Sequence, residues 1–299
     1  MHWEKRWFQY SIIMLLAFVW GSSFILMKIG LKSFNSYQVA AIRILFASSV
    51  LLPIAVKNLR HLKRRDLGSL LFAGFIGSFI PAFLFTKAQT RLDSALAGML
   101  NSLTPVFALI VGLLFFRMKT GWKQVIGITL GMLGAVGLMS QGEGFSIRGF
   151  NTFALFIVLA TLMYGTNVNV IKSSLTHLNG ARITSFSFMF LWPVSLVYLI
   201  TTDFSQVVNS PDWILHLLAI AALGIIGTAL AMLLMNSLIR YASAVFSASV
   251  TYIIPIFALM WGIIDGERIT ILHLVCMSII LTGVYLINQR QKAEGTRQK

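Results

Sequence analysis

The sequence predicts an all-α integral membrane protein in which ten transmembrane helices form two inverted five-helix repeats. Three observations predict this fold: the composition, the number of apolar stretches and an internal repeat. Of the 299 residues, 57% are hydrophobic and only 11% are charged, and the mean hydropathy is +0.82. Because soluble domains average about 25% charged residues, this composition indicates a membrane protein.

Ten stretches are apolar enough to cross a bilayer, whose hydrocarbon core needs about 20 apolar residues per helix. They cover approximately residues 9–31, 37–57, 67–88, 94–116, 123–140, 151–172, 181–201, 213–239, 243–264 and 270–288. The weakest boundary lies near Asp93, where the third and fourth stretches almost touch.

Two short internal sequence repeats, which we call echoes, relate the halves of the chain. At a spacing of 144, Trp20-Gly21-Ser22-Ser23, Lys28 and Asn35 correspond to Tyr164-Gly165-Thr166-Asn167, Lys172 and Asn179. At a spacing of 150, Pro105-Val106-Phe107 corresponds to Pro255-Ile256-Phe257. Five spans per half is an odd number, so the second repeat enters from the opposite side and is inverted. We expect one repeat at 1–142, a second at 149–290 and a cytoplasmic tail at 291–299.

The basic residues predict the orientation. With the N-terminus in the cytoplasm, seventeen of the 24 Lys and Arg residues fall inside, six fall outside, and Arg43 lies within a span. This excess places both termini in the cytoplasm of a plasma membrane, the inner membrane in a bacterium. The same residues account for the net charge of +15, so no nucleic-acid partner is expected.

Acidic residues are absent from the middle of the spans. All nine fall in loops, tails or span edges, which disfavours proton antiport through a membrane carboxylate. Cys276 is the single cysteine, so neither a disulfide nor a thiolate metal site is expected. We expect no metal, no cofactor and no catalytic residue. The expected partners are a small-molecule metabolite and membrane lipid, and the oligomeric state is left open.

Three cations have two readings each. Arg43 lies six residues into the second span, where it either snorkels to the headgroups or binds a carboxylate or phosphate in a cavity. Lys28 and Lys172 occupy matched positions near opposite faces. They are either interfacial anchors or gating residues.

Polar and aromatic side chains within the spans are candidates for a cavity, with helix packing as the alternative. An amide that faces lipid is costly, so the amides must face the bundle. The cavity candidates besides Arg43 are Trp20, Ser23, Phe83, Asn101, Tyr164, Asn167, Trp192, Asn236 and Tyr252. Pro105 and Pro255 are candidate helix bends, because proline removes one backbone hydrogen bond.

Several motifs together resemble the EamA-like ten-helix members of the drug/metabolite transporter superfamily. They are Trp20-Gly21-Ser22-Ser23-Phe24 with Lys28, Arg43 in Ala41-Ile42-Arg43, Leu103-Thr104-Pro105, Ser243-Ala244 leading to Pro255, and Gly266-Glu267-Arg268. The first half has Phe116-Arg117 where the acidic turn is expected, a departure from which we expect little effect on transport. The resemblance implies an exporter or facilitator of small metabolites, with a cavity formed by both halves.

The leading hypothesis is therefore a secondary transporter of a small organic metabolite, such as an amino acid or another carboxylate, that works by alternating access. A passive channel is the first alternative, and an integral membrane enzyme acting on lipid is the second. No clustered His, Asp or Glu supports the enzyme, and no G-x-x-x-x-G-K-[ST] loop supports a primary pump. The sequence names neither the substrate nor a coupling ion.

Overall fold

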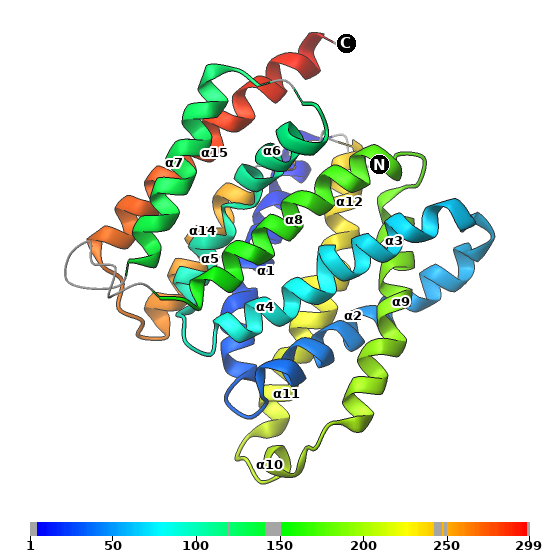
Figure 1. Ribbon diagram of the computed structural model, residues 1–299. Coiled ribbons are helices and arrows are strands. Elements are labelled where there is room, and N and C mark those ends of the chain that lie inside the picture. Colours follow the sequence, from blue (N-terminus) through cyan, green and yellow to red (C-terminus); the bar gives the residue numbers. More distant parts are fainter. Residues whose placement is uncertain (1–4, 119, 141–150, 242–246, 248–249, 298–299) are drawn as a thin grey trace.

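The computed structural model describes residues 5–118, 120–140, 151–241, 247 and 250–297, and its regular elements are helices (Figure 1). The prediction of an all-α fold is confirmed. Eight helical segments in the described ranges are long and apolar enough to cross a membrane. The segments 250–264 and 271–287 are shorter apolar helices, so the total of ten spans stays a prediction.

Five of the long segments are unbroken helices of at least 18 residues. They are α1 (Arg6–Gly30), α2 (Ser36–Asn58), α7 (Trp122–Met139), α8 (Ala154–Ser174) and α9 (Gly180–Thr201). The described chain ends with α14 (Val250–Ile264) and α15 (Ile271–Arg297), and the short helix α10 (Ser205–Val208) follows α9. Two short 3-10 turns, Leu59–His61 and Arg64–Asp66, connect α2 to the next segment.

Two predicted spans contain a π-helical turn in the middle. The third span consists of α3 (Leu67–Gly74), the π-helix η4 (Phe75–Phe79) and α4 (Ile80–Ala88). The eighth consists of α11 (Trp213–Gly224), the π-helix η6 (Ile225–Leu230) and α12 (Ala231–Tyr241). Pro81 explains the first irregularity, because it has no N–H to donate to the carbonyl of Gly77. Such π-turns are frequent at functional sites.

The fourth predicted span is interrupted between α5 (Ser94–Asn101) and α6 (Thr104–Phe115). Pro105 lies in the first turn of α6, and the Thr104 hydroxyl donates to the Asn101 carbonyl (2.9 Å) that the proline leaves free. The predicted bend at Pro105 is therefore a break between two helices. Pro255 lies within α14.

The two asparagines of the first echo begin matched helices. Asn35 precedes α2, and its side chain accepts from the backbone amides of Tyr37 and Gln38 at 3.0 and 2.9 Å. Asn179 precedes α9 and accepts from the amide of Arg182 at 2.8 Å. Both satisfy amides that a helix start leaves without an intrahelical partner.

The helices pack in pairs that join the two halves of the chain. In Figure 1, α7 and α15 lie side by side at one edge, and α2 and α9 lie on the other side of the molecule. Between these pairs, α1 packs on α14 and α8 packs on α6. A Cβ at Gly21 would meet Phe257 and Ala258 of α14, and one at Gly165 would meet Phe107 and Ala108 of α6. Residues at the echo spacings thus make the same close contacts.

Candidate functional site

A cavity of about 320 Å³ lies between helices of both halves. This volume is at the lower end of the range of about 300–1,000 Å³ found for small-molecule sites. Six predicted candidates line it: Trp20, Ser23, Arg43, Asn101, Tyr164 and Asn167. The rest of the lining is largely apolar and includes Phe24, Met27, Phe85, Phe188, Met232 and Met235.

Arg43 is the cationic side chain of this cavity. Its Nε donates to the hydroxyl of Thr228 (3.0 Å), which in turn donates to the carbonyl of Leu223 (3.0 Å) in the π-helical region. Its two terminal nitrogens have no hydrogen-bond or ion-pair partner among the described residues. A guanidinium in this position is held at one edge and offers its fork to an anion.

The π-helices contribute their glycines to the cavity wall. The indole of Trp20 donates to the carbonyl of Gly227 (3.0 Å), and a Cβ at Gly227 would approach the hydroxyl of Ser23. In the other half, a Cβ at Gly77 would collide with the amide of Asn167. Ser23 and Asn167 are echo partners, so each half packs its polar residue on the π-helix of the other half.

Two amides in the cavity lack protein partners within the described part of the chain. The side chains of Asn101 and Asn167 make no hydrogen bond there, and the Asn167 Oδ1 is fully buried. Buried amides in proteins are normally satisfied, so these two groups are available to a ligand or to water. Asn169 is different: its Nδ2 donates to the carbonyls of Ala108 (2.8 Å) and Gly165 (2.9 Å), which joins α8 to α6.

The other four cavity candidates lie away from this lining and have their own contacts. Phe83 packs against Phe79 with tilted rings whose centroids are 4.7 Å apart, and Trp192 donates to the hydroxyl of Ser49 at 3.0 Å.

Asn236 donates to the hydroxyl of Thr184 (2.9 Å), and the Tyr252 hydroxyl donates to the carbonyl of Val284 (3.0 Å). All four were predicted to face a cavity, but in the structure they contact other residues of the helix bundle.

Sequence reasoning overlooked the π-helical wall, although a signal for it exists. Gly74-Phe75-Ile76-Gly77-Ser78 corresponds at the spacing of 150 to Gly224-Ile225-Ile226-Gly227-Thr228. This third echo overlaps both π-helices and includes Thr228, the partner of Arg43. The large apolar lining residues carry no such signal, because they resemble any other residues of an apolar helix.

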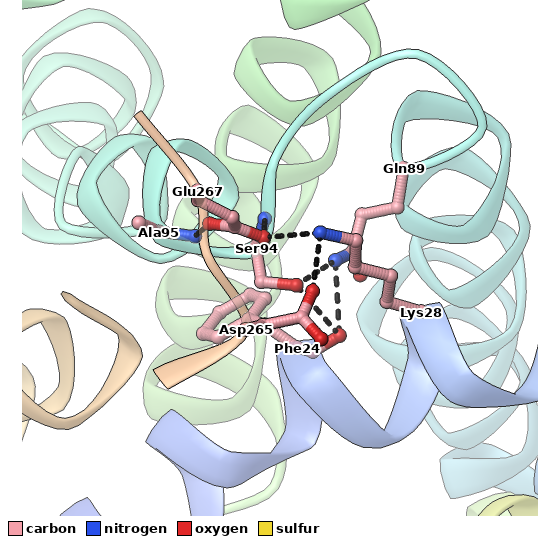
Figure 2. Close-up of polar contacts among 7 residues, drawn as sticks. All are labelled: Phe24, Lys28, Gln89, Ser94, Ala95, Asp265 and Glu267. Carbon is pink, nitrogen blue, oxygen red and sulfur yellow. Dashed lines mark hydrogen bonds and ion pairs between the residues drawn. The ribbon is translucent and has the colours of Figure 1, made fainter. Parts of the chain in front are cut away.

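Lys28 belongs to a polar cluster at the end of α1 (Figure 2). Its Nζ pairs with Asp265 Oδ2 at 2.6 Å and with Glu267 Oε1 at 2.7 Å. The Glu267 side chain is only 1% exposed and also accepts from the backbone amides of Ser94 and Ala95, at 2.8 and 2.9 Å. One carboxylate thus joins α1, the start of α5 and the turn after α14, a favourable place for negative charge because a helix begins there.

Gln89 reinforces this junction. Its Nε2 donates to the carbonyl of Phe24 (3.0 Å) and to the hydroxyl of Ser94 (3.3 Å), as Figure 2 shows. We call Lys28, Gln89, Ser94, Asp265 and Glu267 the Lys28 cluster. Sequence analysis placed the two carboxylates in a loop and did not pair them with Lys28.

Lys172, the echo partner of Lys28, is exposed near the end of α8 and has no ion pair with a described residue. The structure also refines the expected correspondence of the turns. Arg117 has the positive φ (53°) that Gly266 has (77°). Met118 then takes the place of Glu267, because their backbone amides donate to Gly112 (3.1 Å) and Gly262 (2.9 Å), respectively.

A comparison with known protein families identifies the family of this chain. The EamA-like transporter family matches residues 7–140 and again residues 151–289. The chain belongs to the EamA-like transporter family. It is therefore a multi-pass membrane protein, as its composition predicted, and its family is one of transporters.

Relatives carry similar names. The chain is 24% identical to the "Uncharacterized inner membrane transporter YedA" of Escherichia coli (strain K12), over 93% of this chain and 90% of that protein. It is also 24% identical to a "Probable terminal-alkyne amino-acid exporter" of Streptantibioticus cattleyicolor, over 93% and 92%. A third relative is an "S-adenosylmethionine/S-adenosylhomocysteine transporter" of Chlamydia trachomatis, with 24% identity over 95% and 90%.

The fold recurs in a solved structure. A crystal structure shares 15% identity with this chain and matches it with a TM-score of 0.61, over 94% of this chain and 96% of the other. At this identity the likeness concerns the fold alone.

Proposed function

We propose that this member of the family is a secondary transporter, an exporter or facilitator, that moves a small organic metabolite by alternating access. The observation that carries the proposal is the cavity, which is lined from both halves and holds an arginine whose fork has no partner among the residues that the structure describes. Amino acids and other carboxylates are the proposed cargo. The names of the relatives from Streptantibioticus and Chlamydia are consistent with small metabolites of this kind.

The architecture that we propose has ten spans in two inverted repeats, at 1–142 and 149–290, with a tail at 291–299. Three observations support it: the family matches the chain twice, the helices pair across the halves, and Ser23 and Asn167 make equivalent contacts. Inverted repeats offer two related conformations, each open to one side of the membrane. We further propose a plasma-membrane location with both termini in the cytoplasm, on the basis of the lysine and arginine distribution.

In this mechanism the Lys28 cluster closes one end of the transport path. Its ion pairs join α1 to the turn after α14, and Glu267 also accepts a hydrogen bond from the start of α5, so opening that end requires that these contacts separate. The contacts of Gly21 with α14 and of Gly165 with α6 are the surfaces at which these helix pairs either slide or stay packed during the conformational change. Cargo bound at Arg43 lies between the two halves.

Transport in liposomes tests the function. Purified protein is reconstituted and preloaded with unlabelled 3-phenylpropanoate or L-phenylalanine, and uptake of the labelled compound is followed. A carrier gives saturable uptake that preloading accelerates, whereas a channel gives uptake that preloading leaves unchanged. Empty liposomes are the control, and the absence of uptake over an extended metabolite panel contradicts the proposal.

Cysteine labelling tests the orientation separately. Single cysteines replace Lys32 and Lys57 in a chain whose buried Cys276 is changed to Ser. A membrane-impermeant maleimide added to whole cells should label position 32 and leave position 57 unlabelled until the membrane is opened. The reverse pattern contradicts the proposed orientation.

A further inference from the structure

The side chains that line the cavity carry unbalanced charge. In the described lining, Arg43 is the one side chain that carries a formal charge at neutral pH, and no Asp or Glu is present there. Asp265 and Glu267 pair with Lys28 instead. Within the described part of the chain, the positive charge of Arg43 therefore lacks a counter-charge.

The remaining groups of the lining are neutral. Phe24, Phe85 and Phe188 offer aromatic surfaces, and Met27, Met232 and Met235 offer flexible apolar ones. Thioethers adapt to irregular shapes, and aromatic rings bury large apolar areas. The amides of Asn101 and Asn167 provide dipoles without a net charge.

From this imbalance we infer that the cavity selects anionic carboxylates with an apolar body over the corresponding molecules that also carry an ammonium group. This inference rests on the proposed function and narrows its cargo class. The carboxylate binds the free fork of Arg43, so the complex is neutral and both charges keep a partner. The apolar body lies against the aromatic and methionine surfaces.

An α-amino acid fits the same shape but adds a second charge. Its ammonium loses water on entry, and the described lining offers it amide and hydroxyl dipoles in place of a carboxylate. A buried charge without a counter-charge retains most of its desolvation cost. The cavity therefore discriminates by charge between ligands of almost equal size.

Four probes that share a phenylethyl group test this selectivity: 3-phenylpropanoate, N-acetyl-L-phenylalanine, L-phenylalanine and 2-phenylethylamine. Each competes with labelled 3-phenylpropanoate for binding to purified wild-type protein and for transport in liposomes. We expect the two anions to bind at least tenfold more tightly than L-phenylalanine, with 2-phenylethylamine the weakest. N-acetyl-L-phenylalanine controls for size. Like L-phenylalanine it has a nitrogen substituent beside the carboxylate, but acetylation removes the charge of that substituent.

The variant Arg43→Gln should lose the preference for the anions, whereas Lys57→Gln, which removes an exposed charge from the other end of α2, should keep it. Equal or tighter binding of L-phenylalanine by the wild type overturns the inference and leaves the proposed transport function intact. Binding of none of the four compounds also overturns it, and transport of an unrelated metabolite would then still support the function. The ligand series on wild-type protein remains decisive if Arg43→Gln does not fold.

Discussion

The two ends of the proposed transport path differ in charge although they are built from the same packing. Near one end, Lys28 pairs with Asp265 and Glu267 and is part of a hydrogen-bonded junction of three segments. Near the other, its echo partner Lys172 is exposed and has no ion pair among the described residues. The glycine contacts of Gly21 and Gly165, by contrast, are equivalent in the two halves.

The difference arises in a single turn. Over Gly262 lies the carboxylate of Glu267, and over Gly112 lies the sulfur of Met118. A thioether keeps the contact with the glycine but cannot pair with a lysine. Close helix packing thus persists in both halves, while among the described residues the carboxylate over this glycine is present in the second half and a thioether takes its place in the first.

Replacing Glu267 by Gln should have the largest effect on stability. Gln leaves Lys28 with one partner and turns an NH₂ group toward a backbone amide that needs an acceptor. Breaking a buried pair of this kind costs about 3 kcal/mol, so Tm in detergent should fall by several degrees. Asp265→Asn, at a half-exposed partner, should lower Tm less. Equal Tm values for the wild type and Glu267→Gln contradict the role given to this carboxylate.

Removing each lysine compares the ends directly. Lys28→Met leaves the buried Glu267 carboxylate without its cation, so both Tm and the rate of counterflow should change. Lys172→Met, at an exposed position, should change the free energy of unfolding by no more than about 0.5 kcal/mol. If the two variants lose stability equally, the asymmetry of the ends has no energetic consequence.

A carboxylate can be added where the first half lacks one. The Met118 sulfur and Asn169 Oδ1 both lie over Gly112, and Lys172 follows Asn169 by three residues on the same face of α8. Met118→Glu should therefore pair with Lys172, stabilise that end by about 0.5–1 kcal/mol and slow counterflow. Met118→Gln is the matched control, and adding Lys172→Met should remove the effect. Identical behaviour of the Glu and Gln variants contradicts the pairing.

Asp93, next to the Lys28 cluster, should give the smallest effect and a dependence on pH. Burial, and then the negative charge of Glu267, raise the pKa of the Asp93 carboxyl above its ordinary value of 3.8. An acid whose pKa is raised by folding is less favourable to the folded state once it ionises, so its contribution is lost as pH rises through the raised pKa. Asp93→Asn should raise Tm slightly near neutral pH, and this gain should disappear below about pH 3.8. A gain that is independent of pH contradicts this assignment.

Much of the helical framework could be predicted from the sequence. The apolar stretches located the long helices, because a bilayer requires about 20 apolar residues per span. The echo located Trp20, Ser23, Tyr164 and Asn167, which line the cavity, because packing of duplicated segments preserves small and polar residues at fixed spacing. A different argument, from aromatic and amide side chains within apolar spans, included Trp192 and Asn236, whose partners Ser49 and Thr184 lie far away in the sequence.

The sequence by itself determined that the chain is helical, apolar and duplicated, since composition and spacing are properties of the chain alone. Only the tertiary structure decided which polar groups meet. Lys28 and Glu267 are 239 residues apart, and Arg43 and Thr228 are 185 apart. The Trp20 indole and the Gly227 carbonyl of the second π-helix, 207 residues apart, likewise meet only in the folded chain. Such contacts depend on how helices are placed against each other, whereas the hydropathy of the sequence indicates only which segments are helices.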